Sequence, residues 1–298
     1  MLKILIAGVL CISCLAAAQE CTSYVVVNAW EPKVHLAIET LKAGDFDARF
    51  DKGHVPLTIV SASQQYKSRL LVLLEVDGLD KGTATEAVDT VTRFARQAPE
   101  GQPLAFGVYA DRAVFTKGFF SSSTERAAAV SAVREEAGSL GKRVALYESL
   151  IEAVRLFGEH QPGDAILLVG SPYDDRSGKS VGAVEKAFME SGVRLLVMLR
   201  EPLSSLNRDD FLINSHEAEK KLFSDFSFRT GGVYTDFDAG FLNFAWRGYM
   251  LAVKQPGGAG KAARKWKLKL QGPAADNLKH ARIYFPELLL PCGSPPPG

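Results

Sequence analysis

Short, continuous apolar runs alternate with helical patterns through the middle of the chain. Runs of this length, bounded by polar or glycine residues, are typical of strands buried on both faces. They lie at residues 69–76, 104–109, 165–170 and 193–199. Apolar residues spaced three and four apart predict amphipathic helices at 86–95, 123–137, 146–157 and 182–191. This alternation predicts an α/β domain with a doubly wound, mostly parallel sheet at about residues 67–246.

The segments on either side of that domain have a different pattern, typical of β-strands. Residues 24–29 and 56–60 are rich in β-branched side chains, and apolar positions alternate over 46–50, so residues 19–66 are expected to form a small β unit. In residues 247–292, the stretch 265–270 alternates strictly between charged and apolar side chains. We expect these N- and C-terminal strands to pack together as one flanking β unit. The proline-rich tail, 293–298, is expected to be disordered or extended.

Residues 1–18 have the three parts of a secretory signal peptide. Lys3 precedes an apolar run that ends in Ala16-Ala17-Ala18, and this run is shorter than the roughly 20 apolar residues of a membrane-spanning helix. An interior helix is the alternative interpretation. We expect cleavage after Ala18, no transmembrane segment in the cleaved chain, and a secreted, periplasmic or cell-envelope location.

Composition and charge narrow the possible partners. The 298 residues are 47% hydrophobic and 23% charged, which is typical of a folded globular protein. Lys and Arg number 35 against 34 Asp and Glu, and loss of Lys3 would make the two counts equal. A neutral chain has no excess of positive charge with which to bind a phosphate backbone, so nucleic acid is not expected as a partner.

Two of the four cysteines remain after such a cleavage, Cys21 and Cys292, one near each end of the chain. In an oxidising compartment this pair can close a disulfide. Two free or intermolecular thiols are the alternative, and the sequence leaves both open because it does not give the distance between the two Cα atoms.

The sequence gives no clear signal of catalysis or of zinc binding. The five histidines include no i, i+4 pair, and isolated Ser and His residues are more often surface groups than parts of a catalytic triad. Ser177-Gly178-Lys179-Ser180 resembles the end of a phosphate loop, but Tyr173 stands where the loop needs its first glycine. The sequence therefore favours a protein that is not an enzyme.

Several motifs resemble secreted bacterial proteins related to the von Willebrand factor type A (VWFA) domain. The similar segments cover most of the chain after residue 18. They are Leu41-Lys42-Ala43-Gly44-Asp45-Phe46 with Asp51-Lys52-Gly53, Leu146-Tyr147-Glu148-Ser149-Leu150, Arg229-Thr230-Gly231-Gly232-Val233-Tyr234, and Arg247-Gly248-Tyr249. The resemblance implies a VWFA-like fold and binding of a protein partner in adhesion, at the carboxyl ends of the strands.

The resemblance also implies a metal-ion-dependent adhesion site, whose oxygen ligands come from Asp-x-Ser-x-Ser, Thr and Asp on three loops. In this chain, Glu75, Asp77 and Leu79 stand at the three positions of the first loop, and Val144 and Ser171 at those of the other two. Two apolar side chains and an uncharged serine do not suit the octahedral oxygen shell of Mg²⁺. We therefore expect a degenerate site without metal or other cofactor. The residues expected to contact a protein partner are Glu75, Asp77, Leu79, Val144, Ser171, Tyr173 and Asp174.

Other interpretations of the same residues remain open. Ca²⁺ accepts irregular carboxylate geometry, so an adhesion module could use a cluster of acidic side chains at the strand ends. This cluster would contain Glu75, Asp77, Asp80, Asp174 and Asp175. Alternatively, Asp77 and Asp80 cap a helix that begins near Thr83, or the chain is a structural envelope subunit. The basic run 261–267 could contact an anionic surface polymer or protect an edge strand from aggregation.

Overall fold

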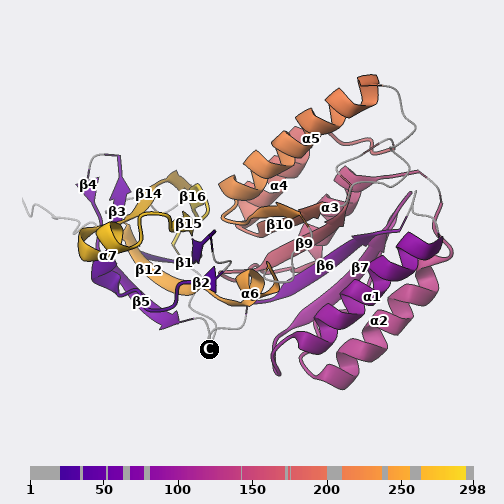
Figure 1. Ribbon diagram of the computed structural model, residues 1–298, viewed down its shortest axis with the longest axis horizontal. Helices are drawn as coiled ribbons and strands as arrows, with labels where there is room; N and C mark the ends of the chain where they lie inside the picture. The colour runs from indigo at the N-terminus through magenta and orange to yellow at the C-terminus, as the bar shows by residue number, and fades with distance from the viewer. Residues whose placement is uncertain are drawn as a thin grey trace, which may run out of the picture.

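The computed structural model describes residues 21–33, 36–51, 53–62, 68–76, 81–141, 143–171, 174, 176–199, 210–236, 241–255 and 263–292 (Figure 1). The predicted signal peptide and the C-terminal tail lie outside these residues. No helix in these ranges is long and apolar enough to cross a membrane.

A six-stranded sheet forms the centre of the larger part of the molecule. Its order is β11-β10-β9-β6-β7-β8, in which only the edge strand β8 runs antiparallel to its neighbour. The strands are β6 (Leu70–Glu75), β7 (Leu104–Tyr109), β8 (Ala113–Phe115), β9 (Ala165–Gly170), β10 (Arg194–Leu199) and β11 (Tyr234–Asp236). The predicted doubly wound α/β fold class is confirmed, and the strand order reverses direction between β6 and β9.

Helices cover both faces of this sheet (Figure 1). The helices are α1 (Lys81–Gln97), α2 (Ser123–Ala137), α3 (Leu146–Leu156), α4 (Val181–Ser191), α5 (Asp210–Arg229) and α6 (Phe241–Trp246). Successive side chains of β6 point to opposite faces. Leu70, Val72 and Leu74 therefore pack in the cluster that contains residues of α1, α2 and α6. Leu71 and Leu73 pack in the cluster of α3, α4 and α5.

A smaller β unit contains strands from both ends of the described chain. One sheet has the order β15-β1-β12-β5, with β2 paired to β1; a second has the order β14-β3-β4; and β13 pairs with β16. The strands are β1 (Cys21–Glu31), β2 (Leu36–Ala37), β3 (Phe46–Phe50), β4 (Gly53–His54), β5 (Leu57–Ala62), β12 (Tyr249–Gln255), β13 (Arg264–Lys265), β14 (Lys267–Leu270), β15 (Arg282–Tyr284) and β16 (Leu288–Leu289). Two short helices, η1 (Ala43–Asp45) and α7 (Gly272–Asn277), complete it. The predicted packing of N-terminal against C-terminal strands is confirmed by the antiparallel pairing of β1 with β12 and β15.

The alternating stretch 265–270 is two strands and not one, because the chain changes partner at Trp266. Lys265 pairs with Leu288 of β16, whereas Lys267 pairs with Arg49 of β3. The indole ring of Trp266 is buried, and its Nε1 donates a hydrogen bond of 2.7 Å to the Pro286 carbonyl oxygen. Burial of this large side chain fixes the break between the two strands.

The two parts of the molecule share a core and a network of polar contacts. The rings of Trp30 and Tyr284, from the β unit, pack edge-on against Phe244 of α6 at 5.7 and 5.0 Å between centroids. Gly231 follows α5 with φ of 78°, and a Cβ atom there would approach the Pro286 nitrogen to 2.5 Å. Position 231 therefore requires glycine for two reasons: the positive φ of its backbone and the close approach of that backbone to the C-terminal segment.

Cys21 and Cys292 are joined by a disulfide, with their Cα atoms 5.6 Å apart. Of the two alternatives that the sequence left open, the structure contains the intramolecular pair. The bridge connects the start of β1 to the segment that follows β16, so it holds the two ends of the described chain together.

Candidate functional site

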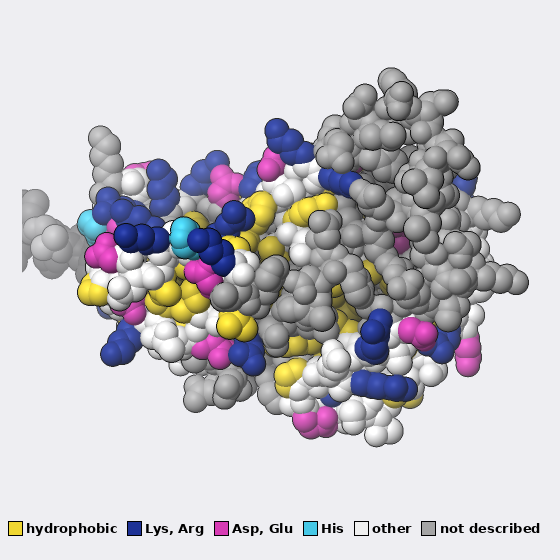
Figure 2. Space-filling model, in the orientation of Figure 1, with side chains coloured by type: hydrophobic (Ala, Val, Ile, Leu, Met, Phe, Trp, Pro, Cys, Tyr) yellow, Lys and Arg dark blue, Asp and Glu magenta, His cyan; other side chains and the backbone are white. Residues whose placement is uncertain are grey.

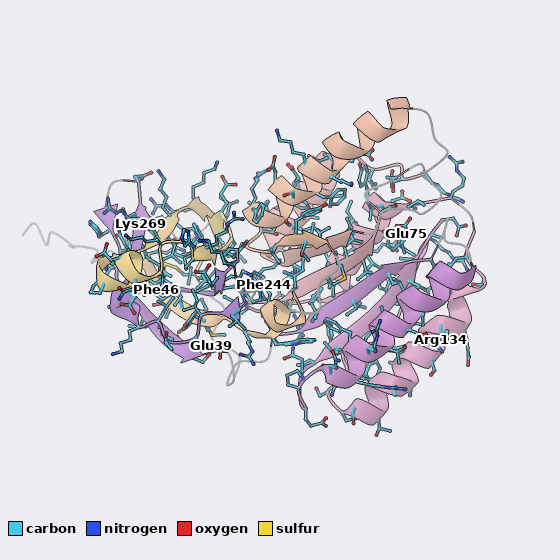
Figure 3. All side chains as sticks on the ribbon, in the orientation of Figure 1. Glu39, Phe46, Glu75, Arg134, Phe244 and Lys269 are labelled. Carbon is cyan, nitrogen blue, oxygen red and sulfur yellow. A yellow bond between two sulfur atoms is a disulfide. The ribbon has the colours of Figure 1, made fainter. Side chains whose placement is uncertain are left out.

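The loops that resemble the adhesion site lie at the carboxyl edge of the six-stranded sheet, where β6 and β9 are parallel neighbours. Glu75 is the last residue of β6, and Ser171 follows the last residue of β9. In open α/β sheets, ligands bind in the crevice beyond the strand ends at the position where the strand order reverses. Glu75 lies at this edge in Figure 3.

Glu75 and Ser171 bind each other across the ends of β6 and β9. The Glu75 carboxylate accepts hydrogen bonds from the backbone N–H of Ser171 and, at 2.9 Å, from its hydroxyl. Both residues are buried. Two donors from one residue fix the carboxylate in place, and such charge-assisted hydrogen bonds are stronger than neutral ones.

Gly170 and Tyr109 complete the surroundings of this carboxylate. A Cβ atom on Gly170 would lie 2.6 Å from Glu75 Oε2 and 2.7 Å from the Tyr109 hydroxyl, so only glycine leaves room for both groups. Burial and the neighbouring Glu75 carboxylate raise the pKa of Tyr109 well above its ordinary value. The Glu75 side chain therefore lies in a closely packed, largely dry environment.

The second loop presents an apolar side chain to the core at the position where the resemblance implies a threonine. Val144 is buried and packs in the cluster of α3, α4 and α5. Its carbonyl oxygen accepts a hydrogen bond of 3.1 Å from the Arg176 N–H, which ties the second loop to the third.

Asp111 closes the same loop from the end of β7. Its Oδ1 accepts a hydrogen bond of 2.7 Å from the Gly141 N–H, and Arg176 lies 3.3 Å from its Oδ2. The hydrogen bond from Gly141 lowers the pKa of Asp111, and the nearby Arg112 and Arg176 add to this effect against the opposing influence of burial. Asp111 is therefore a structural carboxylate within this edge.

Asp174 and Ser177, on the third loop, cap the first turn of α3. Asp174 Oδ1 accepts hydrogen bonds from the Tyr147 N–H at 3.2 Å and the Ser177 hydroxyl at 2.5 Å. The Ser177 hydroxyl in turn accepts a hydrogen bond of 3.1 Å from the Glu148 N–H. The first N–H groups of a helix have no partner within the helix, so these side chains supply the missing acceptors.

A second carboxyl group, Glu219 of α5, faces Asp174 at the same edge. Burial and the charge of Asp174 raise the pKa of Glu219. Burial, Asp174 and Glu219 together raise the pKa of Tyr147. The Asp174 carboxylate thus adds to burial in disfavouring ionisation of the neighbouring Glu219 and Tyr147.

The predicted site residues divide into three groups. Glu75 and Ser171 are in direct contact, while Val144 and Asp174 hold neighbouring loops together through separate contacts. Asp77, Leu79 and Tyr173 lie outside the described residues, as do Asp80 and Asp175 of the calcium hypothesis. Within the ranges that the structure describes, no three His, Cys, Asp or Glu side chains are grouped so that they could hold a metal ion.

Ser171 is poorly placed to act as a nucleophile. Its hydroxyl and its backbone N–H both donate to the same carboxylate, and its side chain is 7% exposed. A serine nucleophile requires a base that takes its proton, a third group that orients the base, and access to substrate. The contacts of Ser171 instead hold two strand ends together.

Sequence reasoning missed Tyr109, Asp111, Gly170, Ser177 and Glu219. Gly170 carried a usable signal, because a glycine that ends a buried strand often marks a close approach of another group. Glu219 carried no such signal in the sequence, because only the tertiary fold brings α5 to this edge of the sheet.

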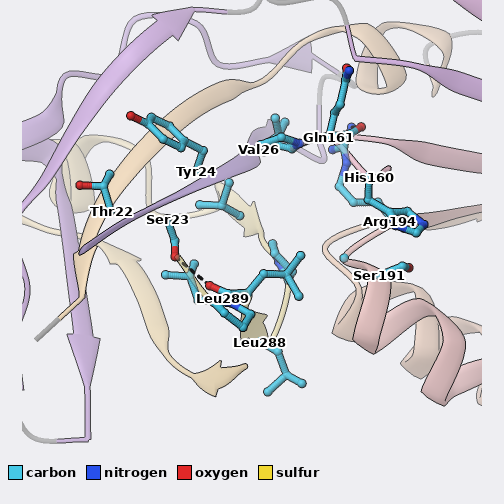
Figure 4. Close-up of a pocket in the computed structure, with 17 residues that line it drawn as sticks. Thr22, Ser23, Tyr24, Val26, His160, Gln161, Ser191, Arg194, Leu288 and Leu289 are labelled. Carbon is cyan, nitrogen blue, oxygen red and sulfur yellow. Dashed lines mark hydrogen bonds between the residues drawn. The ribbon is translucent and has the colours of Figure 1, made fainter. Parts of the chain in front are cut away.

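The pocket shown in Figure 4 lies at the opposite, amino-terminal edge of the sheet, between β1 and the C-terminal segment. Arg194 at the start of β10 donates hydrogen bonds to Asn28 Oδ1 at 2.6 Å and to the Gly163 carbonyl oxygen at 3.2 Å. The Ser23 hydroxyl donates to the Leu290 carbonyl oxygen at 2.8 Å. These contacts join the β unit to the α/β part.

No protein-family model matches the chain, and none of the curated proteins does. Among solved structures, it is similar to the conserved hypothetical protein BatB from Bacteroides thetaiotaomicron, with 14% identity, a TM-score of 0.43, and coverage of 57% of this chain and 90% of that one. A von Willebrand factor type A protein from Catenulispora acidiphila has 10% identity, a TM-score of 0.44, and coverage of 85% and 71%. Proximal thread matrix protein 1 from the mussel byssus, solved with a zinc-occupied adhesion motif, has 13% identity, a TM-score of 0.45, and coverage of 68% and 50%.

Proposed function

We propose that the chain is an exported, non-catalytic protein-binding module of the VWFA type whose strand-end face acts without a bound metal. The partner is a protein that contacts the loops following β6, β7 and β9. The family and the adhesive role come from the resemblance of the sequence motifs. The absence of a metal is inferred from how the described side chains at this face are used.

The contact between Glu75 and Ser171 carries the proposal. A metal at this position would need free oxygen ligands from both loops, yet the carboxylate of one residue binds the backbone and hydroxyl of the other. Val144 adds no oxygen from its side chain, and Asp174 is engaged at the start of α3. These described groups do not fit the near-octahedral oxygen shell of Mg²⁺.

The rim of this face supports protein contact. The side chains of Arg112 and Arg176 are about half exposed beside Asp111. Polar side chains that solvent can reach therefore surround the buried contact between Glu75 and Ser171. Loops positioned by a rigid sheet commonly present such side chains to a partner.

The disulfide supports the exported location. Disulfides persist in the periplasm and outside the cell, whereas reducing systems oppose them in the cytosol. The bridge between Cys21 and Cys292 agrees with the signal peptide expected over residues 1–18.

Site-specific photo-crosslinking in the producing cell tests the proposal. A benzophenone amino acid replaces Arg176 on the strand-end face, and Glu159, exposed near the opposite edge, is the matched control position. We expect a discrete protein adduct from position 176, unchanged by EDTA, and none from position 159.

Two outcomes would contradict the proposal. Loss of the adduct in EDTA would indicate adhesion through a cation. Absence of any adduct at position 176 would favour a structural subunit whose α/β part only supports the β unit.

A further inference from the structure

A second surface, at the other end of the molecule, gathers positive charge on the sheet β14-β3-β4. The register places Lys267 opposite Arg49, Arg49 opposite His54, and Lys269 opposite Asp47. Side chains alternate along a strand, so these five share one face while Ala48 and Leu268 face the core. We call the surface formed by Arg49, His54, Lys267 and Lys269 the cationic face. Figure 2 shows Lys, Arg and His side chains gathered at this end, and Figure 3 places Lys269 far from Glu75.

The described strands β14, β3 and β4 that form the cationic face contain one carboxylate, Asp47, and it is covered. Asp47 Oδ2 lies 2.8 Å from Arg49 and 3.5 Å from Lys269, and Oδ1 lies 2.7 Å from His54 Nδ1. The Asp47 side chain is 2% exposed, whereas those of His54 and Lys269 are 66% and 65% exposed. Lys267 is exposed and forms no ion pair with any residue that the structure describes. Within these three strands, three permanent cations, Arg49, Lys267 and Lys269, against one carboxylate leave a net charge of two positive units.

This arrangement carries a cost that edge protection does not explain. Like charges directly opposite each other destabilise a sheet, and Lys267 and Arg49 are such a pair. Lysine on an edge strand can prevent strand-to-strand aggregation, which would account for β14 alone. Arg49 and Asp47 lie on β3, the central strand, where no edge needs protection. A bound anion would offset the repulsion.

The shape of the face indicates the class of anion. Lys267 and Lys269 are two residues apart, which places them about 7 Å apart along the strand, and neighbouring strands are about 4.8 Å apart. Such rows suit a chain of regularly spaced anionic groups. The large hydrophobic side chains exposed among the described residues are Leu36, Val60 and Phe228. They lie on β2, β5 and α5, so the cationic face offers no apolar group for insertion into a lipid surface.

We propose that the cationic face binds a linear anionic polysaccharide, whose carboxylate groups contact Arg49, Lys267 and Lys269. Lysine ammonium groups act as point charges that accept varied geometry, which suits repeated carboxylates of a flexible polymer. The attraction is electrostatic and weakens as salt screens it.

Titration of the exported chain with polygalacturonate, a linear polymer of uronic acids, tests this. We expect binding at about 0.05 M NaCl that weakens strongly at about 0.5 M, and no binding of neutral dextran.

The double variant Lys267→Gln and Lys269→Gln should bind polygalacturonate about tenfold more weakly than the parent. Lys186→Gln, the same change on the exposed face of α4, should bind within about twofold of the parent. Lys267→Arg should retain binding.

The thermal unfolding midpoint of the single variant Lys267→Gln should equal or exceed that of the parent, because this substitution removes one member of a like-charge pair. Unchanged polygalacturonate binding by a folded double variant would overturn the proposal, and aggregation of that variant with unchanged binding would leave edge protection as the role of β14. Preference for vesicles of phosphatidylglycerol and phosphatidylcholine over the polymer would also overturn it in favour of a membrane surface.

Discussion

At the scale of single residues, one added methylene group changes what the strand-end face can do. The resemblance implies aspartate where Glu75 stands, and the longer side chain extends from β6 to the donors of Ser171 beyond β9. Gly170 leaves the space that this side chain fills. Together these residues form an internal contact between two strand ends, and in the function proposed above this contact takes the place of a metal site.

Glu219→Gln should stabilise the folded protein at neutral pH. Burial and the charge of Asp174 raise the folded-state pKa of Glu219, so its ionised form costs stability once the pH exceeds the ordinary pKa. We expect a gain in unfolding free energy of less than about 1 kcal/mol, because solvent screens this half-exposed group. The gain should disappear as the pH falls below the ordinary value of 4.5.

Thermal unfolding at a series of pH values measures this effect. Glu152→Gln, the same substitution at an exposed position of α3, is the control and should change stability little at any pH. A gain for Glu219→Gln that persisted in acid, or a loss at neutral pH, would contradict the described environment of this carboxyl group.

The sequence predicted which loops meet at the strand ends but not the contacts within them. The positions of Glu75, Val144 and Ser171 followed from strand ends and from the resemblance. The hydrogen bonds between Glu75 and Ser171 depend on the adjacency of β6 and β9, which are separated by a long crossover. Local sequence patterns do not show which strands are neighbours in the sheet when they are far apart along the chain. They also do not show whether the side chain of Asp174 contacts α3 or points to solvent.

At the scale of elements, periodicity located the four central strands and four helices of the α/β part, whereas α5 and α6 were not predicted. The predicted helix at 123–137 coincides with α2, and the apolar runs coincide with the central strands. The edge strands β8 and β11 were not predicted, because each has only three residues and too few positions to establish a pattern. The partner change at Trp266 was also missed, since alternation shows which face is buried but not which strand is the neighbour.

Asp174→Ala should weaken the start of α3. The substitution removes the acceptor of the Tyr147 N–H and of the Ser177 hydroxyl, and loss of such a cap costs about 1 kcal/mol. Chemical denaturation measures the change. Asp174→Asn keeps an acceptor oxygen and should retain most of the stability, so equal losses for the two variants would contradict a capping role.

At the scale of the whole molecule, the β unit depends on both ends of the chain. β1 lies between β12 and β15, so the N-terminal strand cannot leave without exposing the core that the C-terminal strands share with it. The disulfide between Cys21 and Cys292 spans 271 residues of sequence. A bridge across so long a loop restricts the unfolded chain strongly.

Removal of the disulfide should lower stability while leaving the fold intact at ordinary temperature. The chain-entropy model gives a loss of about 5 to 6 kcal/mol for a loop of this length. Differential scanning calorimetry of Cys21→Ser with Cys292→Ser, compared with the oxidised parent, measures it. An unfolding temperature that did not change in the double variant, or in the parent under reducing conditions, would contradict a stabilising role.

The central claim is that the strand-end face acts without a metal because Glu75 and Ser171 bind each other. Isothermal titration of the chelator-treated protein with Mg²⁺, Mn²⁺ and Ca²⁺ tests it most directly, with EDTA titrated in parallel as the positive control for each ion. The account predicts no saturable heat above dilution for any of the three ions. Saturable binding of one ion per chain at micromolar concentration, abolished by Glu75→Ala, would contradict it.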